Sequence, residues 1–418
     1  MSNTAHPDRA SAFWATRPFL ICLGYVAAIR LCASSLGFLP LYLDRRGHAV
    51  SDIGWIMGAG GLGSILVLPA AVFLTRRAPR TTLALGALAL GLAAAALGWA
   101  TAPVALGALH LIAAGASSLT FTCTFARVVE LTPKARRAHG IAIFWAIVQV
   151  SNLAGPAATE ALLEVSWAVA VGAVGLGAAI AGGLLGACAG PPPAPAAEAA
   201  PAARGPDRAF AWLTPRAAGF GLIFLLVSIA WWAQSDYLTS FAHRRGIEPI
   251  TPFFVGYFLV MFPARIFLGN LPERLGKHRV AAASALATAL FFAGLPAAHS
   301  SIALGLLGVI AGLGNCLSWP ALYSISYTHI SIVAYATAYT SFIVASARWI
   351  AGILFGRIGD ELGYEGVFLT AGALILVAAA LLVASARSER RSAARSTLPD
   401  AVLGSAGTGT TRTGTNAE

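Results

Sequence analysis

The chain has 418 residues, of which 57% are hydrophobic and 11% are charged, and its mean hydropathy is +0.74. Soluble globular domains carry about 25% charged residues, so this composition excludes an ordinary water-exposed fold and indicates a protein that faces lipid. The net charge of +11 does not indicate nucleic-acid binding, because the basic residues form short clusters between long apolar runs, a pattern that sets membrane topology.

Twelve apolar runs follow one another along the chain, and roughly 20 apolar residues suffice to cross the hydrocarbon core. The runs are too long and too uniformly apolar for the alternating strands of a membrane barrel, whereas helices satisfy their own backbone hydrogen bonds in lipid. The first run is expected to be retained, since no small-residue cleavage site follows it. We expect helices at residues 18–43, 52–75, 81–100, 103–126, 139–161, 167–188, 217–241, 252–271, 280–298, 301–324, 334–356 and 366–386.

The predicted helices fall into two halves. The first half is predicted at residues 1–189, a linker at 190–215, the second half at 216–386 and a polar cytoplasmic tail at 387–418. Prolines and alanines in the linker favour an extended, unpacked segment. The tail begins with arginines and continues in Ser, Thr and Gly, so it is expected to be a membrane-surface anchor followed by a disordered segment.

The basic residues predict the orientation of the chain. With both termini in the cytoplasm, 20 of the 28 Lys and Arg residues lie in inward-facing segments and three lie inside spans. Cytoplasmic loops carry an excess of Lys and Arg, so this orientation is favoured. The five basic residues in outward loops are Arg45, Arg46, Arg244, Arg245 and Arg357.

A short repeat relates the two halves. Residues 44–47 are Asp-Arg-Arg-Gly and residues 243–246 are His-Arg-Arg-Gly, at the ends of the first and seventh predicted helices. Six helices plus six, related by a repeat and joined by a central linker, form a known transporter plan whose halves rock about a binding site near the midplane.

The loop between the eighth and ninth predicted helices carries the most specific motif. It contains Gly269, three further residues, Glu273, Arg274, one residue, Gly276 and a basic run that ends at Arg279. This resembles the loop signature of the major facilitator superfamily, and the resemblance covers essentially the whole chain. It implies an all-α polytopic membrane protein with twelve transmembrane helices, arranged as two six-helix pseudo-repeats around a central cavity. The loop is then expected to help hold the cytoplasmic side closed, as a gating loop rather than a substrate contact.

Other segments resemble family motifs less completely. The first-half counterpart of the gating loop has Thr75 in place of the acid, whereas Pro133 and Arg136 resemble the lead into the fifth helix. Residues 151–156 resemble part of the Gly-Pro motif of family antiporters, which favours export slightly. A helix kink at Pro156 needs no functional reason, however.

Four charged residues lie well inside predicted helices: Arg30, Asp236, Arg265 and Arg348. A charge at membrane depth costs about 2.5–3.5 kcal/mol on insertion scales, so these side chains are expected to face protein or a water-filled cavity. The seventh and eleventh helices are neighbours in the family fold, which makes an Asp236–Arg348 pair reasonable. Our hypothesis is that Asp236 is the proton-coupling carboxylate; the alternative is a permanent structural ion pair.

Three arginines against one acid leave the expected cavity positive. Guanidinium groups suit carboxylate or phosphate, so Arg30, Arg265 and Arg348 predict an anionic or zwitterionic substrate, such as an organic acid, an amino-acid derivative or a carboxylate-bearing metal chelator. His110 and Trp232 are further candidate substrate contacts. The alternatives are a hydrogen-bonded structural histidine and an aromatic side chain that serves packing.

No nucleotide-binding loop, metal-ligand spacing or catalytic cluster occurs in the sequence. We therefore expect a secondary active transporter of the bacterial inner membrane, coupled to protons, rather than an enzyme, with no cofactor or metal. Its expected partners are a small-molecule substrate, protons and the lipid bilayer, without nucleic acid, and a monomer is expected. Efflux is slightly favoured; the alternatives are an uptake permease for an anionic metabolite or siderophore and a membrane sensor that does not transport.

Overall fold

The computed structural model describes residues 13–133, 136–163, 165–189, 214–268, 271–329 and 333–396. All the regular structure in these ranges is helical. The first half contains η2 (Phe13–Ala15), α1 (Arg17–Ser35), η3 (Leu36–Phe38), α2 (Leu39–Arg45), α3 (Val50–Arg77), α4 (Pro79–Leu97), α5 (Pro103–Leu131), α6 (Arg137–Leu163) and α7 (Trp167–Cys188). The second half contains α8 (Pro215–Arg244), α9 (Thr251–Phe267), α10 (Leu271–Leu275), α11 (Lys277–Gly294), η6 (Leu295–Ala297), α12 (Ser301–His329) and α13 (Val333–Ser396).

The described helices agree with twelve spans. The first span is built from α1, η3 and α2 in succession, so a short 3-10 turn at Leu36–Phe38 interrupts the α-helix. The longest helix, α13, contains two spans that meet at Gly363, whose φ of 68° lies outside the helical region. Within the described residues, ten stretches have the length and apolarity of a span, and Thr251–Ala264 is a shorter apolar helix. One of the ten, Ala338–Ser388, contains the kink at Gly363 and therefore counts as two spans. Together with Thr251–Ala264 this agrees with twelve spans, so the predicted all-α, twelve-helix fold is confirmed.

Helix ends differ from the predicted ends. The helix α5 continues to Leu131, five residues beyond the predicted end at residue 126, so Arg127 is buried inside a helix rather than exposed in a loop. A charged residue does not end a helix, whereas the residue before a proline disfavours the helical conformation. The helix therefore ends just before Thr132 and Pro133.

The C-terminal helix is also longer than predicted. It continues to Ser396, so residues 387–396, which the sequence analysis places in the polar tail, are helical. This stretch contains Ala, Arg and Glu, which are good helix formers, and no Gly or Pro. Residues 397–418 and most of the predicted linker lie outside the described residues.

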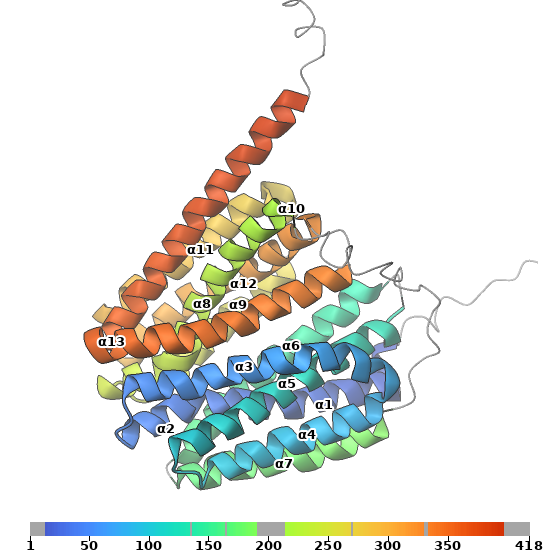
Figure 1. Ribbon diagram of the computed structural model, residues 1–418, viewed down its shortest axis with the longest axis vertical. Coiled ribbons are helices and arrows are strands. Elements are labelled where there is room, and N and C mark those ends of the chain that lie inside the picture. Colours follow the sequence, from blue (N-terminus) through green and yellow to red (C-terminus); the bar gives the residue numbers. More distant parts are fainter. Residues whose placement is uncertain are drawn as a thin grey trace, which may run out of the picture.

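The two halves lie side by side, and α3 of the first half runs along the first part of α13 (Figure 1). Glycines bring these two helices into backbone contact. A Cβ atom on Gly54 would lie 2.1 Å from the carbonyl oxygen of Gly352, and one on Gly352 would lie 2.3 Å from the carbonyl oxygen of Gly54. Small residues allow such close approach between membrane helices, so this contact depends on the absence of side chains at both positions.

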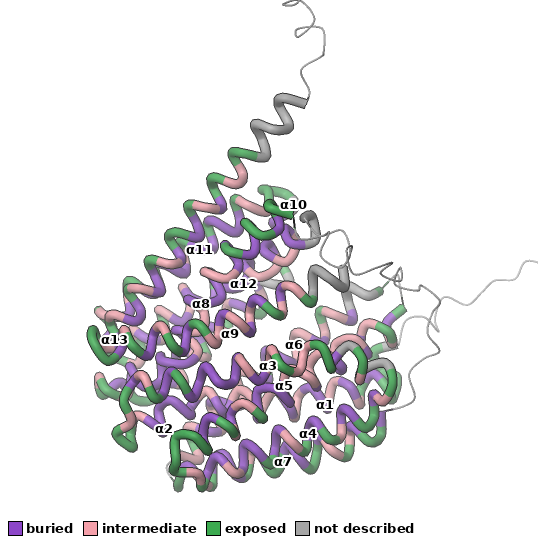
Figure 2. The backbone as a smooth tube through the Cα atoms, in the orientation of Figure 1, coloured by how far each residue is buried: buried purple, intermediate pink, exposed green. Residues whose placement is uncertain are grey.

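The outer surface of the helices is apolar. Large side chains such as Leu66, Leu184, Leu306 and Phe267 are more than half exposed, whereas buried residues line the helix contacts (Figure 2). A soluble protein of this size would not expose so much contiguous apolar surface. The surface indicates that the chain is an integral membrane protein.

Candidate functional site

Asp236 and Arg348 form an ion pair inside the second half. Asp236 lies on α8 and Arg348 lies on α13, and Nη2 of Arg348 is 3.1 Å from Oδ1 of Asp236 while Nε is 3.4 Å from Oδ2. Both side chains are largely buried, with exposed fractions of 3% and 15%. The pair satisfies two charges that would each be costly alone in the membrane.

Trp232 completes this cluster. The guanidinium carbon of Arg348 lies 4.2 Å from the centroid of the Trp232 ring, which is a cation–π contact. The indole nitrogen of Trp232 donates a hydrogen bond to the carbonyl oxygen of Val344 at 3.1 Å. The structure thus brings together three residues predicted from the sequence, on α8 and α13.

Arg30 comes from the first half and contacts a neutral amide. Its Nε and Nη2 atoms donate to Oδ1 of Asn152 on α6, at 3.2 and 2.8 Å. The Asn152 amide nitrogen donates to Oε1 of Gln149 at 3.2 Å, and the Gln149 amide lies 3.4 Å from the sulfur of Met261 on α9. This chain of polar contacts holds the guanidinium in place and crosses to the second half, and it adds no negative charge.

The charges around this site remain mostly positive. The charge of Arg348 acts on both Arg30 and His110, so each of these two groups lies within electrostatic range of Arg348. Asp236 is the carboxylate paired with Arg348, while the hydrogen-bond partner of Arg30 among the described residues is neutral. The side chain of Arg265 lies outside the described residues. The arrangement can attract an anionic group between the halves.

His110 lies in the contact between α5 and α3. It is buried, its Nδ1 atom is 2.9 Å from the carbonyl oxygen of Ile56, and its ring fits against Gly60, where a Cβ atom would lie 2.7 Å from Cε1. This environment favours the structural alternative for His110, since the residue joins two helices of the same half.

The predicted gating loop is described only in part. Gly269 and the side chain of Glu273 lie outside the described residues. Gly276 has a φ of 93° and directly precedes α11, as a tight turn requires. Arg274 and Arg279 are exposed on either side of it.

The repeated tetrapeptides, residues 44–47 and 243–246, end their helices in the same way. Gly47 and Gly246 have φ angles of 80° and 68°, and the backbone N–H of each donates to the carbonyl oxygen three residues earlier, Asp44 and His243, at 2.9 Å. A left-handed glycine just after the last helical residue is a common helix ending. The repeat seen in the sequence is therefore also a repeat in conformation.

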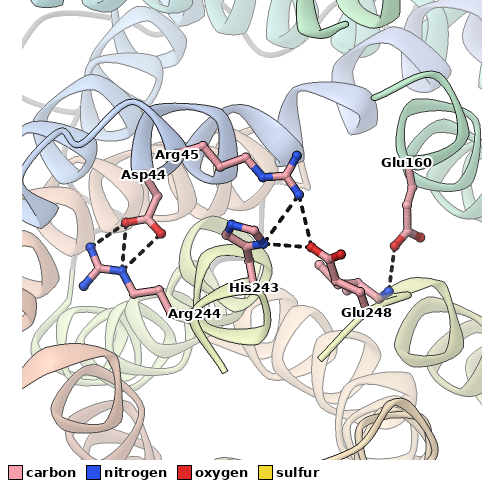
Figure 3. Close-up of polar contacts among 7 residues, drawn as sticks. Asp44, Arg45, Glu160, His243, Arg244 and Glu248 are labelled. Carbon is pink, nitrogen blue, oxygen red and sulfur yellow. Dashed lines mark hydrogen bonds and ion pairs between the residues drawn. The ribbon is translucent and has the colours of Figure 1, made fainter. Parts of the chain in front are cut away.

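The two tetrapeptides also contact each other across the halves (Figure 3). Arg244 donates to the carboxylate of Asp44, with Nη2 2.6 Å from Oδ1. Nη2 of Arg45 lies 3.4 Å from Nδ1 of His243 and 3.1 Å from Oε1 of Glu248, and His243 and Glu248 are 2.7 Å apart. We call these five residues the latch. The first residue of each tetrapeptide thus meets the second residue of the other.

Further contacts close the same end of the molecule. The carboxylate of Glu160 on α6 accepts the backbone N–H groups of Ile250 and Thr251 at 2.6 and 2.9 Å, and also the Thr251 hydroxyl. An acid at a helix N-terminus satisfies free N–H groups and the helix dipole. Across the α3–α13 contact, Asp360 accepts the backbone N–H of Ser51 at 3.2 Å. These contacts, like the latch, join the first half to the second.

The ionisation of Glu248 is coupled to the latch. The hydrogen bond with His243 lowers the pKa of the Glu248 carboxyl below its usual value, and the charges of His243 and Arg45 act in the same direction. Glu248 therefore keeps its negative charge, and its contact with Arg45, to a lower pH than an isolated glutamate would.

Sequence reasoning missed the latch and Asn152. Four of the latch residues lie in the last turns of α2 and α8, and Glu248 follows α8. They are therefore outside the membrane depth at which a charged residue indicates a functional site. The repeat itself was the available signal, because equivalent segments of two pseudo-symmetric halves can meet on the axis that relates them. Within the described residues, no group of three or more His, Cys, Asp or Glu side chains could hold a metal ion.

Comparisons with known proteins agree with this architecture. The family profile described as Major Facilitator Superfamily matches residues 21–256. A protein of Streptomyces lividans described as a chloramphenicol resistance protein is 28% identical over 390 residues, which cover 86% of this chain and 94% of that protein.

Two solved structures have the same fold at low identity. The nucleoside transporter NupG has a TM-score of 0.69 and 14% identity, covering 88% of this chain and 99% of that one. A bacterial homologue of the human lysosomal transporter Spinster, in an inward-facing and unoccupied conformation, has a TM-score of 0.68 and 13% identity, covering 91% and 98%.

Proposed function

We propose that this chain, which belongs to the major facilitator superfamily, is a proton-coupled secondary transporter that exports a small anionic or zwitterionic solute by alternating access. It would reside in the bacterial inner membrane with both termini in the cytoplasm, as the distribution of Lys and Arg predicts. The observation that carries the proposal is the position of Arg30, held by the neutral Asn152 and within electrostatic range of Arg348.

The two arginines suit a substrate carboxylate that lies between the halves. Arg30 belongs to α1 and Arg348 belongs to α13, so an anionic group that contacts both would attract the halves to each other. Guanidinium groups bind carboxylates through paired hydrogen bonds. Binding would thereby favour one arrangement of the halves, which is what alternating access requires of a substrate.

Asp236 supports proton coupling because a bound substrate can change the group that pairs with its carboxylate, and with it the protonation of that carboxylate. If Asp236 takes up a proton before substrate binds, a zwitterion that places its carboxylate on the arginines and its ammonium group on Asp236 would displace that proton, which produces exchange of substrate for protons. A simple anion would instead draw Arg348 away from Asp236 and favour protonation of Asp236, so substrate and proton would move together. Export by exchange therefore favours a zwitterion, whereas uptake by cotransport favours a simple anion.

The closed end of the molecule suggests the state of the cycle. The latch, the Glu160 contacts and the α3–α13 contact all lie at the end that the charge distribution predicts to be extracytoplasmic. With that orientation, we propose that the structure is an inward-facing state.

A second candidate is export of a neutral aromatic drug. The relative described as a chloramphenicol resistance protein supports export. An aromatic cluster adjoins the charged site, with the Trp231 ring 4.6 Å from that of Trp232 and 5.7 Å from that of Trp319. Such rings could stack against a neutral aromatic ligand.

Metabolite profiling of cells and medium, with and without the gene, would identify the solute class. A zwitterion or anion that accumulates in cells lacking the gene supports the main proposal, and a cation alone contradicts it. Restored susceptibility to a neutral aromatic drug, with no zwitterion or anion changing, would favour the second candidate.

Transport in proteoliposomes would test the coupling. Asp236→Asn should remove the dependence on a pH gradient, while Asp52→Asn, an exposed acid at the start of α3, should retain it. Full gradient dependence in Asp236→Asn would assign Asp236 to a structural pair.

A further inference from the structure

A groove runs along the outer surface of the second half, between α11 and the last part of α13. It has a volume of about 460 Å³, and its walls are apolar apart from Arg387 at one end. Ala282 on α11 and Ala380 and Ala384 on α13 make it hollow, because an alanine leaves room that a larger side chain would fill. Figure 1 shows the last part of α13 beside α11 and continuing past it.

The groove faces the bilayer. Leu286 and Leu376 in its walls are 55% and 51% exposed, and both belong to stretches with the length and hydropathy of a membrane span. An acyl chain can occupy this groove, because its apolar walls make the same kind of contact with a bound chain as with the surrounding bilayer. The apolar walls alone do not distinguish one lipid from another, so any preference must come from the end of the groove.

That end is basic. The helices α11 and α13 are antiparallel here, since Ala282 near the start of α11 lies in the same groove as Arg387 near the end of α13. Arg387 is exposed, and Arg279, one turn before Ala282 on α11, is exposed as well. Arg387 lines the groove, and Arg279 shares a helix face with Ala282 because residues three apart are neighbours on a helix surface. Guanidinium groups at this end complement a phosphate that carries a net negative charge.

We propose that this groove binds an anionic phospholipid, with one acyl chain along the alanine-lined part and the phosphate beside Arg387 and Arg279. With the predicted orientation, the lipid belongs to the cytoplasmic leaflet, where basic pockets between membrane helices recognise anionic headgroups. A zwitterionic phospholipid with the same chains fills the groove equally well but lacks the net charge, so it binds more weakly. This inference is independent of the transported solute.

Native mass spectrometry of the purified full-length protein would test the site, with phosphatidylglycerol and phosphatidylcholine of identical acyl chains as probes. The wild-type protein should retain phosphatidylglycerol preferentially. Each of Arg387→Gln and Arg279→Gln should raise the Kd for phosphatidylglycerol about fivefold, as expected for one basic residue at a membrane surface. Arg17→Gln is the matched control, because Arg17 is an exposed arginine at the start of α1 in the other half, and it should leave the Kd unchanged.

A groove-filling variant separates a defined site from general attraction to a basic surface. Ala380 is exposed in the groove, so Ala380→Trp should block the acyl chain and abolish retention while every arginine remains. Equal retention of both lipids by the wild-type protein would overturn the proposal. So would undiminished phosphatidylglycerol binding in Arg387→Gln and Arg279→Gln, which are surface changes that leave the helices packed.

Discussion

Asp44 and Arg244 lie 200 positions apart in the sequence, yet the Arg244 guanidinium donates to both carboxylate oxygens of Asp44, with Nε 3.1 Å from Oδ2 and Nη2 2.6 Å from Oδ1. Asp44 is the first residue of one tetrapeptide and Arg244 is the second residue of the other. The equivalent contact, between the second residue of the first tetrapeptide and the first residue of the second, joins Arg45 and His243. There, histidine replaces the acid and Glu248 supplies the negative charge.

Loss of Arg244 should open the latch. The side chain of Asp44 is 3% exposed and also accepts the Tyr364 hydroxyl at 3.1 Å, so Arg244→Gln would leave a buried carboxylate without its cationic partner. Because Arg244 itself is half exposed and screened by solvent, we expect a cost of about 1–2 kcal/mol, or roughly a 5- to 30-fold shift toward states with this end open. Distances between spin labels at positions 104 and 302, exposed on opposite halves at this end, would measure the shift. Arg357→Gln, an exposed arginine on α13, should not alter the distances.

The latch should weaken in acid through Glu248. The pKa of Glu248 is lowered in the latched state, mainly by the hydrogen bond with His243. Its stabilising contribution is therefore complete above the ordinary pKa of a glutamate, and it is lost as the pH falls through the lowered pKa. The same pair of spin labels should report more opening over that acidic range. Glu248→Gln should be more open at neutral pH and should lose this dependence, whereas Glu361→Gln, an exposed acid on α13, should behave as the wild type. An unchanged acid response in Glu248→Gln would assign the titration to another group.

A methyl group at Gly352 should separate α3 from α13. The added Cβ atom would lie 2.3 Å from the carbonyl oxygen of Gly54. A flexible side chain could rotate to relieve such a clash, but a helix backbone cannot. We expect Gly352→Ala to destabilise the closed arrangement by about 1–3 kcal/mol, as overpacking commonly does. The melting temperature in detergent and the distance between labels would both record the change. Gly177→Ala on α7, where a Cβ atom has open space, is the control, and an equal effect of the two substitutions would refute a specific role for the helix contact.

Asn152 should act on transport through the charge and position of Arg30. Asn152→Leu removes the acceptor that holds the guanidinium, so KM for the transported anion or zwitterion should rise about tenfold, equivalent to about 1.4 kcal/mol, with a smaller effect on the maximal rate. Asn152→Asp preserves the shape and adds a negative charge that would neutralise Arg30, so it should raise KM further. If Asn152→Asp transports like the wild type, the positive charge of Arg30 does not bind substrate.

The membrane depth of the charged residues was predictable from the sequence, but their partners were only partly so. Asp236 and Arg348 could be expected to meet because their helices are neighbours in the family fold, and they lie 3.1 Å apart. The partner of Arg30 could not be predicted in this way. Asn152 is one of many polar residues on the helices of the first half, and its contact with Arg30 depends on how α1 is rotated against α6.

The amino-acid sequence is sufficient to place this chain in a membrane as a set of helices. Each apolar run must satisfy its own backbone hydrogen bonds in lipid, so run length and composition decide the element without reference to the rest of the molecule. The pairing of Asp44 with Arg244, by contrast, depends on how the two halves pack. The Gly54–Gly352 contact holds the two halves together at the same end as Asp44 and Arg244. A glycine in one helix permits such a contact but does not identify the helix that it meets.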